Sequence, residues 1–284
     1  MTPDEYCQDK AAKSGSSFYY SFRFLPEKQR QAIIALYAFC REVDDAVDEI
    51  SDTELAATTL EWWRNEISQT FKGQATHPVG QALQIALENF DLHEEYFMEI
   101  IDGMVMDLDQ FSYPSFKNLA LYCHRAASVV GLLSVEIFGY QERGTLKYAE
   151  KLGMALQLTN IIRDVREDAE RGRIYLPLDE LEKFNVKTQD LLDLKTSPEL
   201  IELLKFQTQR AKSYYQQAMQ ALPDGDRYQQ RTGLIMAAIY EATLNEIEKD
   251  GFGVMQRRIS LTPIRKLWLA WRTARHEKRL HKQQ

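Results

Sequence analysis

Apolar residues recur every three or four positions along most of this chain. Residues with that spacing lie on one face of an α-helix, so the pattern predicts amphipathic helices. After Pro26, the apolar stripe consists of Ile33, Leu36, Tyr37, Cys40 and Val47. Further helices are predicted over residues 3–13, 53–72, 78–90, 94–109, 116–138, 145–168, 179–222 (with a second start at 197) and 224–254. We therefore expect an all-α fold.

The composition favours one helical domain. Thirteen Gly and eight Pro among 284 residues leave little turn chemistry for a many-stranded fold. A hydrophobic content of 44% can fill a sizeable core. No internal repeat, low-complexity block or change of composition marks a linker, so residues 1–284 are predicted to form a single domain.

Charge and cysteine content narrow the class of protein. The formal net charge of −7 and the pI near 5.4 argue against nucleic acid as the main partner. Three cysteines without a Cys-x-x-Cys spacing fit a reduced, cytoplasmic protein. The N-terminus lacks the basic and apolar segments of a signal peptide. The longest apolar run, at residues 126–138, is shorter than the roughly twenty residues needed to span a bilayer, so no membrane-spanning segment is expected.

A first acidic ladder lies in the helix predicted after Pro26. Asp44 and Asp48 are one helical turn apart, and Asp45 and Glu49 repeat this relation beside them. Like charges at this spacing repel each other and require a cation nearby, which Arg41 can supply. Because Asp44 continues the apolar stripe, the carboxylates are predicted to point inward, where they need partners. The alternative is a solvated acidic face.

A second ladder follows far downstream. Gln157, Asn160, Asp164 and Asp168 are separated by steps of three, four and four, which keeps them on one line of a helix. All four offer oxygen ligands, and Mg²⁺ prefers oxygen ligands together with phosphate oxygens and water. No Glu-x-x-His occurs, which tells against a di-iron bundle. The two ladders predict a divalent metal cluster held between helices.

Arginines accompany these acids. Arg163 lies within the second ladder, and Arg171-Gly172-Arg173-Ile174-Tyr175-Leu176-Pro177 follows it directly. Together with Arg41, these cations would complement a diphosphate bound through metal.

Three other features each have two interpretations. The acidic helix end Asp107-Leu108-Asp109 contributes to a metal site or, as is more common, faces water. Tyr122 lies on an apolar helix face, where a tyrosine is usually a core residue with a satisfied hydroxyl. The loop Ser14-Gly15-Ser16-Ser17 offers backbone and hydroxyl donors to an anion or is an ordinary loop.

The two ladders and the arginine segment together resemble the squalene and phytoene synthase family of head-to-head prenyl transferases. The serine loop, the helix that carries Tyr122 and the helix that carries Tyr240 also occur in the order of that family. Within the family, the segments 14–20 and 122–133 look most like bacterial presqualene diphosphate synthases of hopanoid biosynthesis.

The resemblance implies an isoprenoid synthase helical bundle with a central cavity and a set of site residues. Positions that match the Mg²⁺ and diphosphate ligands, most of them also catalytic, are Asp44, Asp48, Asn160, Asp164 and Asp168. Positions that match contacts near the diphosphates are Arg41, Gln157, Arg163 and Arg257. Tyr122 and Tyr240 match cavity tyrosines, and Ser14 and Ser16 stand where some relatives carry His and Lys against a diphosphate.

The implied reaction condenses two farnesyl diphosphates into presqualene diphosphate and releases diphosphate. The base that removes the proton is left open between Tyr122 and the released diphosphate. A phytoene or dehydrosqualene synthase, or a squalene synthase that also uses NADPH, is the alternative within the family. A non-catalytic helical scaffold is the alternative from another class. A downstream isoprenoid enzyme would be a natural partner.

The C-terminal segment from Arg257 to Gln284 is distinctly basic. It holds nine Lys or Arg against the single acid Glu277, whereas the rest of the chain has 26 basic and 41 acidic residues. Over residues 259–284 a helix is predicted, with an apolar stripe of Leu261, Ile264, Trp268 and Trp271. This pattern is typical of helices that lie on an anionic membrane, here its inner face, and equally of a helix packed on the bundle with a solvated basic side.

Overall fold

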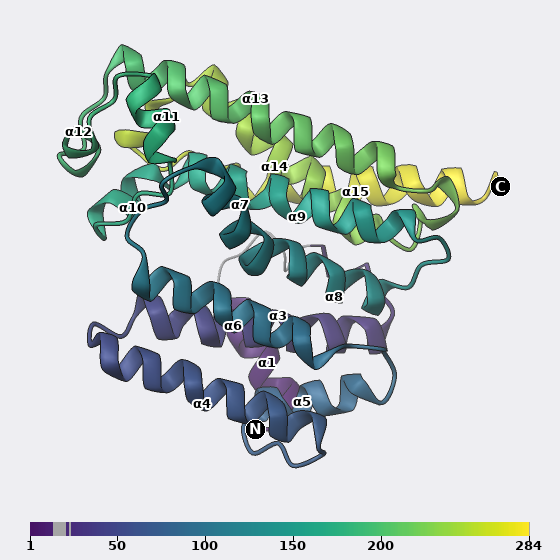
Figure 1. Ribbon diagram of the computed structural model, residues 1–284. Helices are drawn as coiled ribbons and strands as arrows, with labels where there is room; N and C mark the ends of the chain where they lie inside the picture. Colours follow the sequence, from purple (N-terminus) through teal and green to yellow (C-terminus); the bar gives the residue numbers. More distant parts are fainter. Residues whose placement is uncertain (14–20, 23, 284) are drawn as a thin grey trace.

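Helices dominate the structure (Figure 1). It is a computed structural model that describes residues 1–13, 21–22 and 24–283; within these, it has one isolated bridge, between Ser112 and Ile174, and no strand. The α-helices are α1 (Pro3–Lys13), α3 (Glu27–Asp48), α4 (Thr53–Phe71), α5 (Pro78–Leu87), α6 (Glu94–Asp109), α7 (Phe116–Cys123), α8 (Val129–Phe138), α9 (Gly144–Arg163), α10 (Val165–Glu170), α11 (Leu178–Lys183), α12 (Thr188–Leu192), α13 (Pro198–Ala221), α14 (Arg231–Lys249) and α15 (Pro263–His281). The all-α prediction is confirmed.

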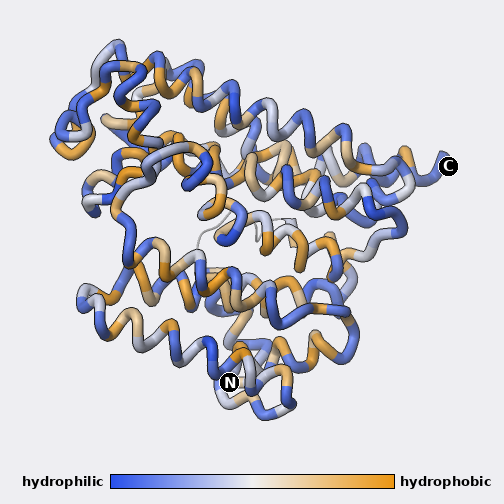
Figure 2. Tube along the Cα trace, viewed as in Figure 1, coloured by the Kyte–Doolittle hydropathy of each residue, from blue (hydrophilic) through white to orange (hydrophobic). Residues whose placement is uncertain are grey.

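Two groups of helices face each other. α1, α3, α4, α5 and α6 form one group, α9, α13, α14 and α15 form most of the other, and α7 and α8 lie between them (Figure 1). Each group has its own hydrophobic cluster of buried side chains, one drawn from residues 7–138 and one from residues 106–270. Hydrophobic and hydrophilic positions alternate along the helices, as amphipathic packing requires (Figure 2).

Helix boundaries follow the predicted ones where capping and apolar spacing agree. α1 and α6 have the predicted bounds, and α3 begins directly after Pro26. The prediction of a helix from residue 224 is wrong at its start, because Asp224–Asp226 is a 3₁₀ turn and α14 begins at Arg231. The buried Asp226 carboxylate instead accepts bonds from the backbone N–H groups of residues 141 and 142 and from the Thr145 hydroxyl.

The predicted helix over residues 116–138 contains a π-helical turn, His124–Ser128, between α7 and α8. This turn packs against α9 at Gly153, backbone to backbone. A Cβ placed on Gly153 would lie 2.6 Å from Ser128 Cα and 2.7 Å from the Ala127 carbonyl oxygen. Glycine is therefore required where the two segments meet.

By length and composition alone, the segment Phe116–Phe138 is long and apolar enough to cross a membrane. The expectation that no segment spans a membrane rested on the shorter run 126–138. Because part of this segment is buried inside the fold, and core helices share its length and composition, we interpret it as a core segment.

Candidate active site

A cavity of about 790 Å³ lies between the two groups of helices. α3 and α6 supply one wall, α9 and α14 supply the other, and the π-helical turn and α8 lie between them. Acids and arginines of both predicted motifs line one end, and most of the remaining wall is apolar. Its size is in the upper part of the range for small-molecule sites.

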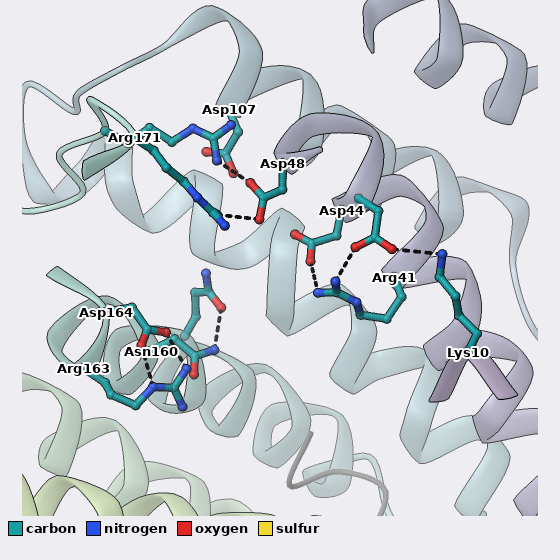
Figure 3. A network of polar contacts seen from close by, with 12 residues as sticks. Lys10, Arg41, Asp44, Asp48, Asp107, Asn160, Arg163, Asp164 and Arg171 are labelled. Carbon is teal, nitrogen blue, oxygen red and sulfur yellow. Dashed lines mark hydrogen bonds and ion pairs between the residues drawn. The ribbon is translucent and has the colours of Figure 1, made fainter. Parts of the chain in front are cut away.

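The first ladder divides its acids between the cavity and the outside. Asp44 and Asp48 line the cavity, whereas Asp45 binds Lys10 at 2.9 Å. Arg41 forms ion pairs with both Asp44 and Asp45, which offsets their mutual repulsion (Figure 3). Burial, opposed mainly by the Arg41 charge, raises the pKa of Asp44 to about 6.

Asp48 connects the two motifs. Its carboxylate accepts bonds of 2.7 Å from Arg171 and from Arg173, which belong to the segment after the second ladder. Arg173 also donates to the backbone oxygen of Val47. The arginines predicted to accompany the second ladder thus lie against the first (Figure 3).

The sequence suggested that the second ladder lies on one continuous helix. In the structure, this helix is interrupted. α9 ends at Arg163, and Asp164 has non-helical backbone angles before α10 begins. Asp164 N–H still bonds to Asn160 and Asp168 N–H to Asp164, so the four-residue step survives. Asn160, Asp164 and Asp168 consequently all line the cavity, together with Gln157.

Cations surround Asp164. Arg163 donates from Nε at 2.7 Å, and Arg258 lies 3.1 Å away. Arg163 is also hydrogen-bonded to Tyr240, a buried cavity tyrosine, so the predicted Arg163, Tyr240 and Asp164 lie together. Among the described residues, the basic side chains that line the cavity are Arg41, Arg163, Arg171, Arg173, Arg258 and Lys266.

Three predicted substrate contacts are not found at the cavity: Arg257 lies outside it, and Ser14 and Ser16 are not described by the structure. Arg257 is 71% exposed, pairs with Asp250 and does not line the cavity; its neighbour Arg258 does. Ser14 and Ser16 fall outside the described residues.

The donor set fits a hard divalent cation, although the carboxylates are not gathered into a metal cluster. Within the described residues, no group of three or more His, Cys, Asp or Glu side chains is arranged to chelate an ion, because arginines hold Asp44, Asp48 and Asp164. Asn160 Oδ1 and Glu167 Oε2 are buried without a partner in that part of the chain, and both residues line the cavity.

Asp168 supports the same conclusion. Burial, followed by the negative charges of Asp164 and Asp107, raises the pKa of Asp168 to about 8. A bound cation would relieve this accumulated negative charge. Oxygen ligands alone, two of them unpartnered, suit a hard divalent cation.

Asp107 lines the site, although sequence reasoning considered both a metal-site role and a solvent-facing role and favoured the second. It is 6% exposed and lines the cavity, and its carboxylate accepts bonds from Tyr122 at 2.8 Å and Tyr113 at 3.4 Å. Burial raises its pKa to about 7. The signal was available: Ile100, Met104 and Asp107 follow helical spacing, and all three line the cavity.

Tyr122 belongs to a cluster of three tyrosines. Its ring centroid lies 5.2 Å from that of Tyr175, and Tyr113 stacks on Tyr175 at 5.8 Å. Burial and the adjacent Asp107 charge hold the pKa of Tyr122 well above its usual value, so the phenol stays protonated. The hydroxyl is satisfied, as the core interpretation expected, but Tyr122 also lines the cavity.

The far end of the cavity, where Phe138 lies, carries a small polar group. Tyr148 lies roughly 24 Å from Asp164 along α9, at about 1.5 Å per residue. The Tyr148 hydroxyl, Gln230 Oε1 and Thr232 Oγ1 are buried without partners among the described residues. A Cβ at Gly233 would lie 2.5 Å from the Tyr148 oxygen, so this hydroxyl abuts the start of α14.

Comparison with known proteins agrees with this architecture. The family described as squalene/phytoene synthase matches residues 11–265. The chain belongs to the squalene/phytoene synthase family. Family members are prenyltransferases that act on prenyl diphosphates and generally use divalent metal ions.

Relatives within the family carry different names at almost equal similarity. The phytoene synthase of Arthrospira platensis is 37% identical over 279 residues, 93% of this chain and 89% of the relative. The presqualene diphosphate synthase of Zymomonas mobilis is 36% identical over 269 residues, 93% of this chain and 91% of the relative. The crystal structure of a dehydrosqualene synthase in complex with ligand has a TM-score of 0.86 at 27% identity, covering 97% of this chain and 96% of that one.

Proposed function

We propose that this family member condenses two farnesyl diphosphates head-to-head into presqualene diphosphate, with release of diphosphate, in a Mg²⁺-dependent reaction. The observation that supports this most directly is the cavity itself. Its acids and arginines meet at one end, and an apolar chamber extends from them. A substrate with a diphosphate head and a long hydrocarbon tail matches that division.

The polar end binds and orients the heads. Asp44, Asp48, Asn160, Asp164 and Asp168 would hold Mg²⁺, which neutralises a diphosphate so that it can leave. Arginines that now pair with these acids, such as Arg163 and Arg171, would turn to the phosphate oxygens. Binding therefore exchanges arginine–carboxylate pairs for arginine–phosphate and metal–carboxylate contacts.

The apolar chamber protects the allylic cation that remains after the diphosphate leaves. Apolar walls exclude water, which would otherwise add to the cation and convert it into an alcohol. Aromatic faces near the cation stabilise it by roughly 0.5 to 2 kcal/mol each. The double bond of the second substrate then attacks, and loss of one proton closes the cyclopropane ring of the product.

Two groups can accept that proton. One is the released diphosphate. The other is Tyr122, provided that it passes its own proton to Asp107, 2.8 Å away, as it receives the new one. Because the pKa of Tyr122 is raised well above its usual value, Tyr122 does not ionise by itself near neutral pH and needs Asp107 to accept its proton. Asp107, whose pKa is raised to about 7, is suited to take a proton at that pH.

The polar far end of the cavity favours a C15 tail over a C20 tail. An apolar tail that reached Tyr148, Gln230 and Thr232 would keep water from three buried polar groups that have no partner among the described residues. Each such group costs about 1–3 kcal/mol. We expect the double variant Tyr148→Phe/Thr232→Val to raise the relative use of geranylgeranyl diphosphate by about tenfold in kcat/KM. Tyr140→Phe, whose hydroxyl bonds to Glu136 outside the cavity, is the matched control.

The decisive experiment identifies the products. Purified protein is incubated with farnesyl diphosphate and Mg²⁺, without and with NADPH, and the lipids are identified by mass spectrometry. Presqualene diphosphate in both reactions supports the proposal. Squalene formed only with NADPH would make this a complete squalene synthase, and dehydrosqualene without NADPH a dehydrosqualene synthase. Turnover of geranylgeranyl diphosphate alone indicates a phytoene synthase, and no turnover of either substrate favours the scaffold.

We further propose a cytoplasmic location and a downstream isoprenoid enzyme as partner. All three cysteines are free thiols, and burial raises the pKa of Cys7, Cys40 and Cys123 above the usual range, which suits a reducing compartment. Presqualene diphosphate still carries a leaving group, so an enzyme that removes its diphosphate must consume it.

A further inference from the structure

The outer face of α15 presents an apolar stripe to solvent. Ile264 is 81% exposed, Trp268 and Trp271 are each 51% exposed, and Leu267 is 44% exposed. Positions i, i+3, i+4 and i+7 share one helix face, so these four side chains form a single patch. The sequence-based stripe had included Leu261, but Leu261 precedes the helix, is buried and lines the cavity. Leu267 takes its place.

The opposite face of α15 is fixed to the bundle. Ala270 is fully buried, and the buried Glu277 forms an ion pair of 2.8 Å with Arg227. Arg265 pairs with Glu246 of α14, and the His281 ring stacks on Tyr228 with centroids 4.4 Å apart. The tryptophans are therefore held outward by a docked helix, and about half of each remains exposed in the described structure.

Cations continue the same outer face. Arg275, Lys278 and Lys282 follow Trp271 at steps of four, three and four, and all are exposed. Arg272 and Arg275 lie over the rings of Trp268 and Trp271 at 5.3 and 5.1 Å. Glu277, the one acid of α15, points inward to Arg227. The outer face thus combines exposed tryptophans with positive charge only.

We propose that α15 docks this protein onto an anionic lipid bilayer. Tryptophans are suited to the boundary between headgroups and acyl chains, and flanking lysines and arginines bind anionic headgroups. A second copy of the chain is a poorer occupant, because it would bring an equally cationic face against this one. The proposal commits to lipid and does not depend on which prenyl diphosphate is used.

Docking through α15 also places the cavity beside the bilayer. Ser260 and Leu261, just before the helix, and Lys266, in its first turns, line the cavity wall. The membrane-facing helix and the cavity thus share one short segment, which lies near Arg163 and Arg258 at the polar end.

Vesicle flotation tests the proposal with the full-length protein. Vesicles of phosphatidylcholine, with and without phosphatidylglycerol, are mixed with wild type and with Trp268→Ala/Trp271→Ala. We expect wild type to float mainly with the anionic vesicles, less so at high salt, and the double variant to bind at least tenfold more weakly. Arg275→Glu/Lys278→Glu should lose binding to anionic vesicles to a similar extent.

Matched controls separate a docking face from general stickiness. Trp62→Ala removes a 43% exposed tryptophan on α4, and Lys72→Glu/Lys117→Glu reverses two exposed lysines, one directly after α4 and one in α7. Both controls should float like wild type. A blue shift of tryptophan emission on adding anionic vesicles, lost in Trp268→Ala/Trp271→Ala, would give independent support.

Two results would overturn the inference. One is equal flotation of wild type and the tryptophan double variant. The other is a dimer in sedimentation that depends on Trp268 and Trp271 while no vesicles are bound, which would assign the face to a second copy. Circular dichroism of each variant confirms that the helices are intact, so loss of binding is not loss of fold.

Discussion

Replacing Gly153 by alanine tests the contact between α9 and the π-helical turn. The new Cβ would lie 2.6, 2.7 and 2.8 Å from Ser128 Cα, Ala127 O and Ser128 N, all of them backbone atoms. Carbon atoms normally approach to about 3.5–4.0 Å, so the two segments must separate by roughly 1 Å. Because no flexible side chain can move aside instead, the backbone itself must shift.

The expected cost follows from two opposing effects. Overpacking of this kind destabilises by about 1–3 kcal/mol, and contact with backbone argues for the upper end. Alanine recovers about 1 kcal/mol through its better helix propensity. The net loss of about 2 kcal/mol in the free energy of unfolding would lower Tm by roughly 4–8 °C. Since Ala126 and Ala127 line the cavity, a 1 Å shift would also reduce kcat/KM by about 10²-fold.

Calorimetry and steady-state kinetics measure the two effects, with Gly225→Ala as the control. Gly225 is exposed in the turn Asp224–Asp226, and a Cβ there would have no heavy atom within 4 Å. That control should stay within about 0.5 kcal/mol of wild type. If Gly153→Ala melted and turned over like Gly225→Ala, the backbone contact would not have the role assigned to it.

Other predictions concern the acids and the anchoring of α15. Asp48→Asn should lower kcat/KM at least about 100-fold, while Glu49→Gln, the exposed neighbour, should leave it nearly unchanged; equal effects would contradict the assignment. Mg²⁺ with inorganic diphosphate at 100 times Kd should stabilise wild type by about 2.7 kcal/mol in thermal melts, and Asp48→Asn should show much less. Glu277→Ala should lower the free energy of unfolding, measured with denaturant, by about 3 kcal/mol because it leaves Arg227 unpaired. Glu202→Ala, at an exposed pair with Lys205, should lower it by less than about 1 kcal/mol. Similar losses in the two variants would refute this reasoning.

Local spacing predicted most of the helices and the inward direction of the first ladder. Asp44 follows Cys40 by four residues on an apolar stripe, and it does line the cavity. The same rule applied to Ile100, Met104 and Asp107 would have placed Asp107 inside. At Asp107, the general tendency of acidic helix ends to face water suggested the opposite orientation.

Features that depend on irregular backbone or on distant segments were not predictable in this way. Arg257 and Arg258 lie between η3 (Gly253–Met255) and α15, where no regular period indicates which side chain points inward. The pairing of Asp48 with Arg171 and Arg173 joins residues far apart in sequence. The polar group of Tyr148, Gln230 and Thr232 arises only where the starts of α9 and α14 meet.

The bonds from Arg171 and Arg173 to Asp48 have a mechanical consequence. These ion pairs hold the segment after α10 against the end of α3, at the polar end of the cavity. If Asp48 held the proposed metal ion, Arg171 and Arg173 would be free to bind the proposed diphosphate. We therefore expect the ion pairs of Arg171 and Arg173 with Asp48 to break when substrate binds, and new contacts through the substrate to connect the same two segments. Substrate binding and the closing of the two cavity walls would then occur together.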